Sequence, residues 1–316
     1  MKILRQSFGI LIAITLLFFL IKPFVQTHTQ LEDVTLQIQW RWLISSFAFL
    51  LFYRSTYIVP FAKLLRGVTL PQVSFRDAFT LFHLANITRY LPGRIWGIVR
   101  LLILSERFGF SKTAVGVSLT LHVGIETALG GLIAMSLIFS KQMRTTAYLV
   151  LEKISGHAVL FTLIVIGIVI GILFLIPKMS SKARHFLKTL RQIGTPLLPK
   201  HFWKQWLNIL QGHTLLWCCQ GLAFFLFVKS LASVQWKDAG VLSACYAFAW
   251  IVGFLSFLTP GGLGVREGLL GLLLANYMPT SQATLIALLC RVWMLSAEIV
   301  LAGLAFFLHK TADRHS

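Results

Sequence analysis

Charged side chains are scarce in this chain of 316 residues. Only 12% of the residues are Asp, Glu, Lys or Arg, and ten residues in all are acidic, whereas a typical soluble domain carries about 25% charged residues. Hydrophobic residues reach 57%, the mean hydropathy is +0.78, and long runs are almost free of charge. This composition excludes an ordinary soluble domain and predicts an all-α polytopic integral membrane protein.

Motifs for metal or nucleotide binding are missing as well. The four cysteines lie inside apolar segments without a C-x-x-C spacing, and the nine histidines form no H-E-x-x-H array. The glycine-rich residues 261–264 lack the spacing of a P-loop. We therefore expect neither a metal site nor a cofactor.

A nucleic-acid partner is not expected either, although the formal net charge is +19. The basic residues gather in the connections between apolar runs, which is typical of the cytoplasmic loops of membrane proteins. Basic patches interleaved with aromatic residues, on which bases could stack, do not occur.

Six apolar segments are long enough to cross a bilayer: residues 8–25, 40–60, 113–139, 157–177, 207–231 and 282–308. Residues 8–25 resemble a signal peptide, but no small-residue cleavage site follows, so we interpret them as an uncleaved span. Two more segments, 75–104 and 239–275, are interrupted by Pro-Gly and are predicted to be re-entrant hairpins that return to their own side. The chain then forms one domain, 1–316, with about eight membrane segments.

The distribution of Lys and Arg gives this topology an orientation. The basic residues concentrate on the side of the N-terminus, so the positive-inside rule places both termini in the cytoplasm. We expect the protein in the cell (inner) membrane. The basic cytoplasmic loop, residues 178–206, carries apolar residues at helical spacing among its Lys and Arg residues. This pattern favours an amphipathic helix on the inner leaflet, with a solvated linker as the alternative.

The second interrupted segment reads Thr259-Pro260-Gly261-Gly262-Leu263-Gly264-Val265-Arg266-Glu267-Gly268. Proline removes a backbone donor and glycine permits a sharp turn. Residues 263–275 are too few to cross a hydrocarbon core of about 30 Å. We therefore predict two half-helices that meet at a tip inside the membrane, with a loop between two short spans as the alternative. The second half-helix would begin with free backbone N–H groups beside Arg266, which is a site for an anion.

The first interrupted segment repeats this pattern as Leu91-Pro92-Gly93-Arg94-Ile95-Trp96-Gly97. Each interrupted segment is followed by a long span with an acid near its middle, Glu126 in the first and Glu298 in the second. The repeat-like units cover about 75–139 and 239–308. Three crossings separate the interrupted segments, so the second unit would be inverted, as in many secondary transporters. A chance similarity between short segments is the alternative.

Several charges fall inside the predicted membrane segments: Arg94, Glu126, Arg266, Glu267, Arg291 and Glu298. A charge at the bilayer centre costs about 2.5–3.5 kcal/mol, so each needs a partner or a wet cavity. Arg291 and Glu298 lie roughly 10 Å apart along one helix, and each is expected to face a charge on another element, with the hairpin tips as candidates. Such pairs either take part in transport or simply pin a hairpin in place.

Two other polar residues receive structural interpretations. Arg54 lies near the inner end of segment 40–60, where its side chain can reach the interface, so we assign it no role. His122 lies one helical turn before Glu126, and we expect a hydrogen-bonded packing histidine in preference to a proton relay.

The two interrupted motifs, together with Arg291 and Glu298, resemble the transmembrane domain of lysylphosphatidylglycerol synthases and of stand-alone flippase-like membrane proteins. The resemblance covers nearly the whole chain, and Arg100 also matches by position. Gly97-Ile98 replaces the Gly-Glu of many relatives. The soluble aminoacyl-transfer domain is absent, so the resemblance does not imply synthase activity, and we expect no enzyme.

What the resemblance does imply is translocation of a lipid or a lipid-linked glycan. A phosphate-bearing head group would pass between the hairpin tips, which are formed by Pro92, Gly93, Pro260, Gly261, Gly262 and Gly264. Arg94, Arg100 and Arg266 would hold the anion, and Glu126, Glu267 and Glu298 would balance the arginines when the site is empty. The expected partners are anionic membrane lipids or a polyprenyl-phosphate-linked substrate. A membrane-embedded transferase and a non-catalytic partner of a glycosyltransferase are the alternatives.

Overall fold

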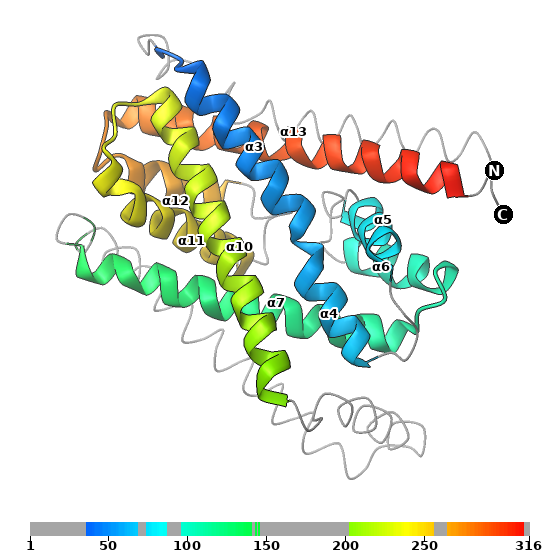
Figure 1. Ribbon diagram of the computed structural model, residues 1–316. Helices are drawn as coiled ribbons and strands as arrows, with labels where there is room; N and C mark the ends of the chain where they lie inside the picture. Colours follow the sequence, from blue (N-terminus) through cyan, green and yellow to red (C-terminus); the bar gives the residue numbers. More distant parts are fainter. Residues whose placement is uncertain are drawn as a thin grey trace.

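The computed structural model describes residues 36–68, 74–86, 96–140, 143, 145, 202–255 and 264–312. Every element within these residues is a helix (Figure 1). The elements are α3 (Trp40–Thr56), α4 (Ile58–Val68), α5 (Phe75–Asn86), α6 (Trp96–Arg107), α7 (Lys112–Met135), η2 (Ser136–Phe139), α10 (Phe202–Leu231), η5 (Trp236–Asp238), α11 (Ala239–Leu255), α12 (Val265–Leu274) and α13 (Thr280–Ala312). The predicted spans 8–25 and 157–177, residues 178–201 of the predicted loop, and Pro92, Gly93, Arg94, Pro260, Gly261 and Gly262 lie outside the described residues. Residues 202–206, which we predicted to be the end of that loop, form the start of α10.

Five stretches of the described chain are long and apolar enough to cross a membrane: Trp40–Arg66, Lys112–Phe139, Trp206–Leu231, Trp236–Leu255 and Thr280–Leu308. Four of them confirm the predicted segments 40–60, 113–139, 207–231 and 282–308. The chain is therefore a multi-pass helical membrane protein.

The second predicted span is longer than expected. We placed its end at Pro60, but Pro60 lies in the first turn of α4, where a backbone N–H has no helical partner to lose. The helix continues to Val68 after a break at Tyr57, whose N–H still donates to the Tyr53 carbonyl at 2.9 Å. Arg54 consequently lies in the middle of the apolar stretch Trp40–Arg66 and not near its end.

Three of the helices beside the chain interruptions, α5, α6 and α12, are short. The α5 and α6 helices have 12 residues each, which corresponds to about 18 Å and is less than a bilayer core of about 30 Å. The α12 helix has 10 residues. The α11 helix differs, because together with η5 it forms a 20-residue stretch that is long enough to cross by itself.

Two sets of three helices pack reciprocally. One set is α5, α6 and α7, and the other is α11, α12 and α13. Within each set the first two helices pack together, and the first helix also packs against the long third helix of the other set: α5 against α13, and α11 against α7. In Figure 1, α13 and α7 accordingly run along opposite sides, with α3 and α10 side by side between them.

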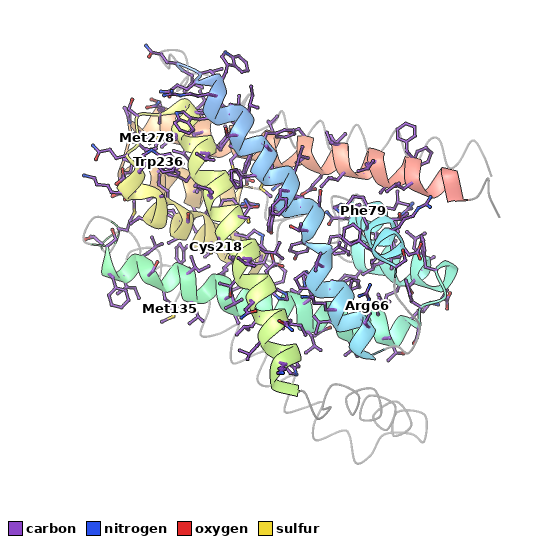
Figure 2. The ribbon with its side chains drawn as sticks, in the orientation of Figure 1. Arg66, Phe79, Met135, Cys218, Trp236 and Met278 are labelled. Atoms are coloured by element: carbon purple, nitrogen blue, oxygen red, sulfur yellow. The ribbon has the colours of Figure 1, made fainter. Side chains whose placement is uncertain are left out.

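The ends of the α3–α10 pair differ in chemistry. At one end, the Lys229 ammonium lies 5.6–5.9 Å from the ring centroids of Trp42, Phe225 and Trp236. Arg66, at the far end of α4, is exposed, and Figure 2 shows it far from the labelled Trp236 of this cluster. Aromatic clusters of this kind are typical of a membrane–water interface.

Candidate functional site

A cavity of about 870 Å³ lies among α3, α5, α6, α7, α11, α12 and α13. Residues beside both chain interruptions line it: Asn86 at the end of α5, Gly97 at the start of α6, Phe254 near the end of α11 and Arg266 at the start of α12. The two interrupted segments, far apart in sequence, therefore contribute to one cavity.

Two ion pairs support the wall of this cavity. Arg54 Nη2 lies 3.2 Å from Glu298 Oε1 and joins α3 to α13. Arg291 Nη1 lies 3.1 Å from Glu267 Oε1 and joins α13 to α12. The arginines line the cavity, whereas the glutamates are buried behind them.

Arg266 lines the same cavity in a different environment. Its side chain is 8% exposed, its guanidinium lies 4.8 Å above the Tyr246 ring, and Nη2 donates to Met294 Sδ at 2.9 Å. Among the described residues, no ion pair joins Arg266 to a carboxylate. A thioether is a weak acceptor, so this guanidinium can still form strong hydrogen bonds with an anion.

The backbone around Arg266 also corrects one expectation. Gly264 precedes α12 with a φ of +82°, a conformation that favours glycine. Its N–H, which we expected to be free for an anion, donates to Glu267 Oε2 at 2.8 Å. Glu267 therefore caps the start of α12, and the same side chain pairs with Arg291.

Glu126 is a buried carboxylate on the α7 wall of the cavity. It accepts hydrogen bonds from the hydroxyls of Tyr53, at 3.4 Å, and Tyr57. Trp217 Nε1 on α10 donates to the Glu126 backbone carbonyl at 3.0 Å. Phenol hydroxyls that stabilise the charged form let a carboxylate persist in an otherwise apolar wall.

One turn before Glu126, His122 reaches α10. His122 Nδ1 lies 2.9 Å from His213 Nε2, and both rings are buried. The expectation of a hydrogen-bonded packing histidine is confirmed.

Of the predicted site residues, Glu126, Arg266 and Arg291 line the cavity, and Glu267 and Glu298 hold cavity arginines from behind. Arg100 is exposed on α6 and is not among the lining residues. Arg54, to which we gave no role, is the partner of Glu298, where we expected a hairpin arginine. The apolar run that continues past Pro60 is the sequence signal that would have placed Arg54 inside the membrane.

Comparison with protein families matches residues 6–303 to the lysylphosphatidylglycerol synthase TM region. This range covers nearly the whole chain. Neither the comparison with curated proteins nor that with solved structures finds a match.

Proposed function

The chain belongs to the family of the lysylphosphatidylglycerol synthase TM region, a family of membrane proteins of lipid or lipid-linked processes, and on this premise we propose that it translocates an anionic lipid or a lipid-linked glycan. The phosphate of the head group crosses through the cavity while the acyl or prenyl tails stay in the bilayer. The substrate is an anionic membrane lipid or a polyprenyl-phosphate-linked molecule, and no bond of it is broken.

The observation that carries this proposal is the state of Arg266. A guanidinium at a cavity wall, next to an aromatic ring and a thioether, meets a phosphate oxygen without first giving up a carboxylate partner. Arginine is well suited to phosphate because its fork of donors matches two oxygens at once. Arg54 and Arg291 also line the cavity, but each is already paired with a carboxylate, Glu298 and Glu267 respectively. They therefore contribute positive charge to the cavity wall while their side chains stay in place.

The arrangement of the helices supports a binding site for the transported head group near the middle of the membrane. We propose that α5–α6 and α11–α12 are hairpins that enter from opposite faces, as halves of an inverted repeat. The short lengths of α5, α6 and α12 favour hairpins, and the reciprocal packing of α5 with α13 and of α11 with α7 favours a two-fold relation. Transporters with inverted repeats bind their substrates where such broken helices meet.

The proposed setting is the inner membrane with both termini in the cytoplasm. The aromatic cluster around Lys229 then marks the outer interface, and Arg66 lies toward the cytoplasm. A glycosyltransferase that makes or uses the lipid-linked substrate is a partner compatible with this setting.

The test is lipid movement in proteoliposomes of phosphatidylcholine that contain a trace of fluorescent phosphatidylglycerol or polyprenyl phosphate. Loss of one charge-assisted interaction of about 1.5–3 kcal/mol corresponds to a rate about 10- to 100-fold lower for Arg266→Ala. Arg41→Ala, which removes an exposed arginine outside the cavity, is the matched control and should keep the wild-type rate.

Folded wild-type protein that moves neither lipid refutes the proposal, and so does an Arg266→Ala variant as fast as the wild type. Conversion of the labelled polyprenyl phosphate into a new product would point to a transferase instead.

A further inference from the structure

The His122–His213 pair has a defined arrangement of protons. His213 Nδ1 lies 2.9 Å from the Ile209 carbonyl, an acceptor only, so His213 Nδ1 carries a hydrogen. In a neutral ring the other nitrogen, Nε2, is then an acceptor. The hydrogen bond between the rings is therefore donated by His122 Nδ1, which leaves His122 Nε2 with a bare lone pair.

That lone pair has no hydrogen-bond partner among the described residues, although the ring is fully buried. His122 is also one of the residues that line the cavity. A buried acceptor without a donor is costly, and in this neutral ring it is the nitrogen that can accept a proton. The packing role expected from the sequence uses only the opposite nitrogen.

The surroundings of His122 disfavour a positive charge while the cavity is empty, because the ring is buried and faces a second imidazole. Tyr57 packs edge-on at 4.6 Å from the junction of α3 and α4, Phe61 of α4 lies 5.9 Å away, and His213 approaches from α10. On its own helix, Glu126 lies one turn away and accepts the Tyr57 hydroxyl. Within the described part of the chain, the remaining charged residues that line the cavity are the arginines Arg54, Arg266 and Arg291.

Among the described residues, these charges balance. The three cavity arginines are matched by Glu126, Glu267 and Glu298, which line the cavity or pair with the arginines. A phosphate that reaches Arg266 adds negative charge to this balanced, low-dielectric site. A proton on His122 Nε2 offsets that charge, because opposite charges attract strongly in such surroundings.

We propose that His122 takes up one proton together with the anionic head group, so that translocation is coupled to proton movement. The proton comes from water, adds to the lone pair of Nε2, and returns to water when the head group leaves on the other side. No other bond forms or breaks. This inference rests on the proposed lipid translocation and names its coupling ion.

Linkage makes the effect measurable as binding. If the head group favours the protonated form of His122, protonation favours head-group binding by the same factor. The affinity for the lipid then falls as the pH rises, by at most about tenfold per pH unit for a single proton. Lipid binding in turn takes up as much as about one proton per head group.

The experiment is calorimetric titration of the purified full chain with phosphatidylglycerol, in pairs of buffers that differ in ionisation enthalpy, between about pH 6 and pH 8. The number of protons taken up per bound lipid is independent of the affinity itself. Wild-type protein should take up protons, and His122→Gln, which has no titratable nitrogen at this position, should take up few or none per bound lipid. His83→Gln is the matched control, since His83 is also buried but does not line the cavity, and it should retain the uptake.

Lipid binding by the wild type without proton uptake overturns the inference and leaves the proposed function standing. Unchanged uptake in His122→Gln, or its loss only in Glu126→Gln, also overturns it. Failure of the folded wild type to bind the lipid overturns the proposed function and this inference together. Should His122→Gln not fold, the pH dependence of the wild-type affinity decides, because a flat profile contradicts the proposal.

A transport measurement gives an independent readout. In proteoliposomes with a gradient of about one pH unit, the wild type should build up the lipid on the alkaline side, by at most about tenfold for one-to-one coupling. In His122→Gln the same gradient should produce no asymmetry. An equal asymmetry in both proteins contradicts the coupling role.

Discussion

Removal of one partner from the Arg54–Glu298 ion pair should destabilise the protein far more than removal of both. The pair joins α3 to α13 at 3.2 Å, and the side chains are only 10% and 6% exposed. Arg54→Met leaves a buried carboxylate without this partner, and loss of one member of a buried pair costs about 3–5 kcal/mol. Glu298→Met leaves a buried guanidinium and should cost about as much.

The double variant Arg54→Met/Glu298→Met should be close to the wild type in stability. Replacement of a buried pair by apolar side chains of similar size is often neutral or stabilising, and the lipid surroundings add to the cost of an unpaired charge. The effects of the two substitutions are therefore strongly non-additive.

The measurement is the free energy of unfolding in mixed micelles, followed by the fluorescence of the nine tryptophans. The exposed pair Lys112–Glu106, at 2.8 Å and with side chains 51% and 60% exposed, is the matched control. Glu106→Gln should change the stability by only about 0–1 kcal/mol. Single variants of the buried pair that cost no more than this control, or a double variant that costs the sum of the singles, would refute the reasoning.

Three further predictions concern packing and capping. A methyl group at position 130 would collide with the Trp217 indole, so Gly130→Ala should lower the free energy of unfolding by about 1–3 kcal/mol. Gly116 lies in the same helix with nothing within 4 Å of an added methyl group, so Gly116→Ala should be neutral or stabilising. Equal thermal stability of these two variants would contradict the contact. Glu267→Ala loses both the ion pair with Arg291 and the cap on the Gly264 N–H, whereas Glu267→Gln keeps an acceptor for that N–H. The free energy of unfolding of Glu267→Ala should therefore be about 0.5–2 kcal/mol lower than that of Glu267→Gln. Identical values for the two variants would exclude the cap. Trp217→Phe removes the donor to the Glu126 carbonyl and should cost at least about 1 kcal/mol, and a cost near zero in the same unfolding assay would count against that hydrogen bond.

The sequence predicted the helical class, the family and four of the five spans in the described chain, because hydrophobic length and charge distribution report directly on a bilayer. It also identified Glu126, Arg266 and Arg291 as residues of one site, since charges inside apolar segments are costly and need a common polar environment.

The partners of those charges could not be predicted. Glu298 pairs with Arg54 because α13 packs against α3, and this long-range contact has no local signature. Pro60 concealed the length of its span, since proline ends a helix in its interior but is tolerated in a first turn. Residues 236–255 are long and apolar enough to cross a membrane, whereas the sequence predicted them only as the first half of the hairpin 239–275.

The most direct test of the central claim, that two interrupted segments enter from opposite faces to form one cavity, is cysteine labelling. Pro92→Cys and Pro260→Cys, each made in a cysteine-free background, are treated with a small membrane-impermeant thiol reagent from each side of sealed vesicles. Our account predicts that position 92 is labelled from the cytoplasmic side and position 260 from the opposite side, and that an anionic lipid slows both reactions. Rapid labelling of both positions from the same side, unaffected by lipid, would contradict it.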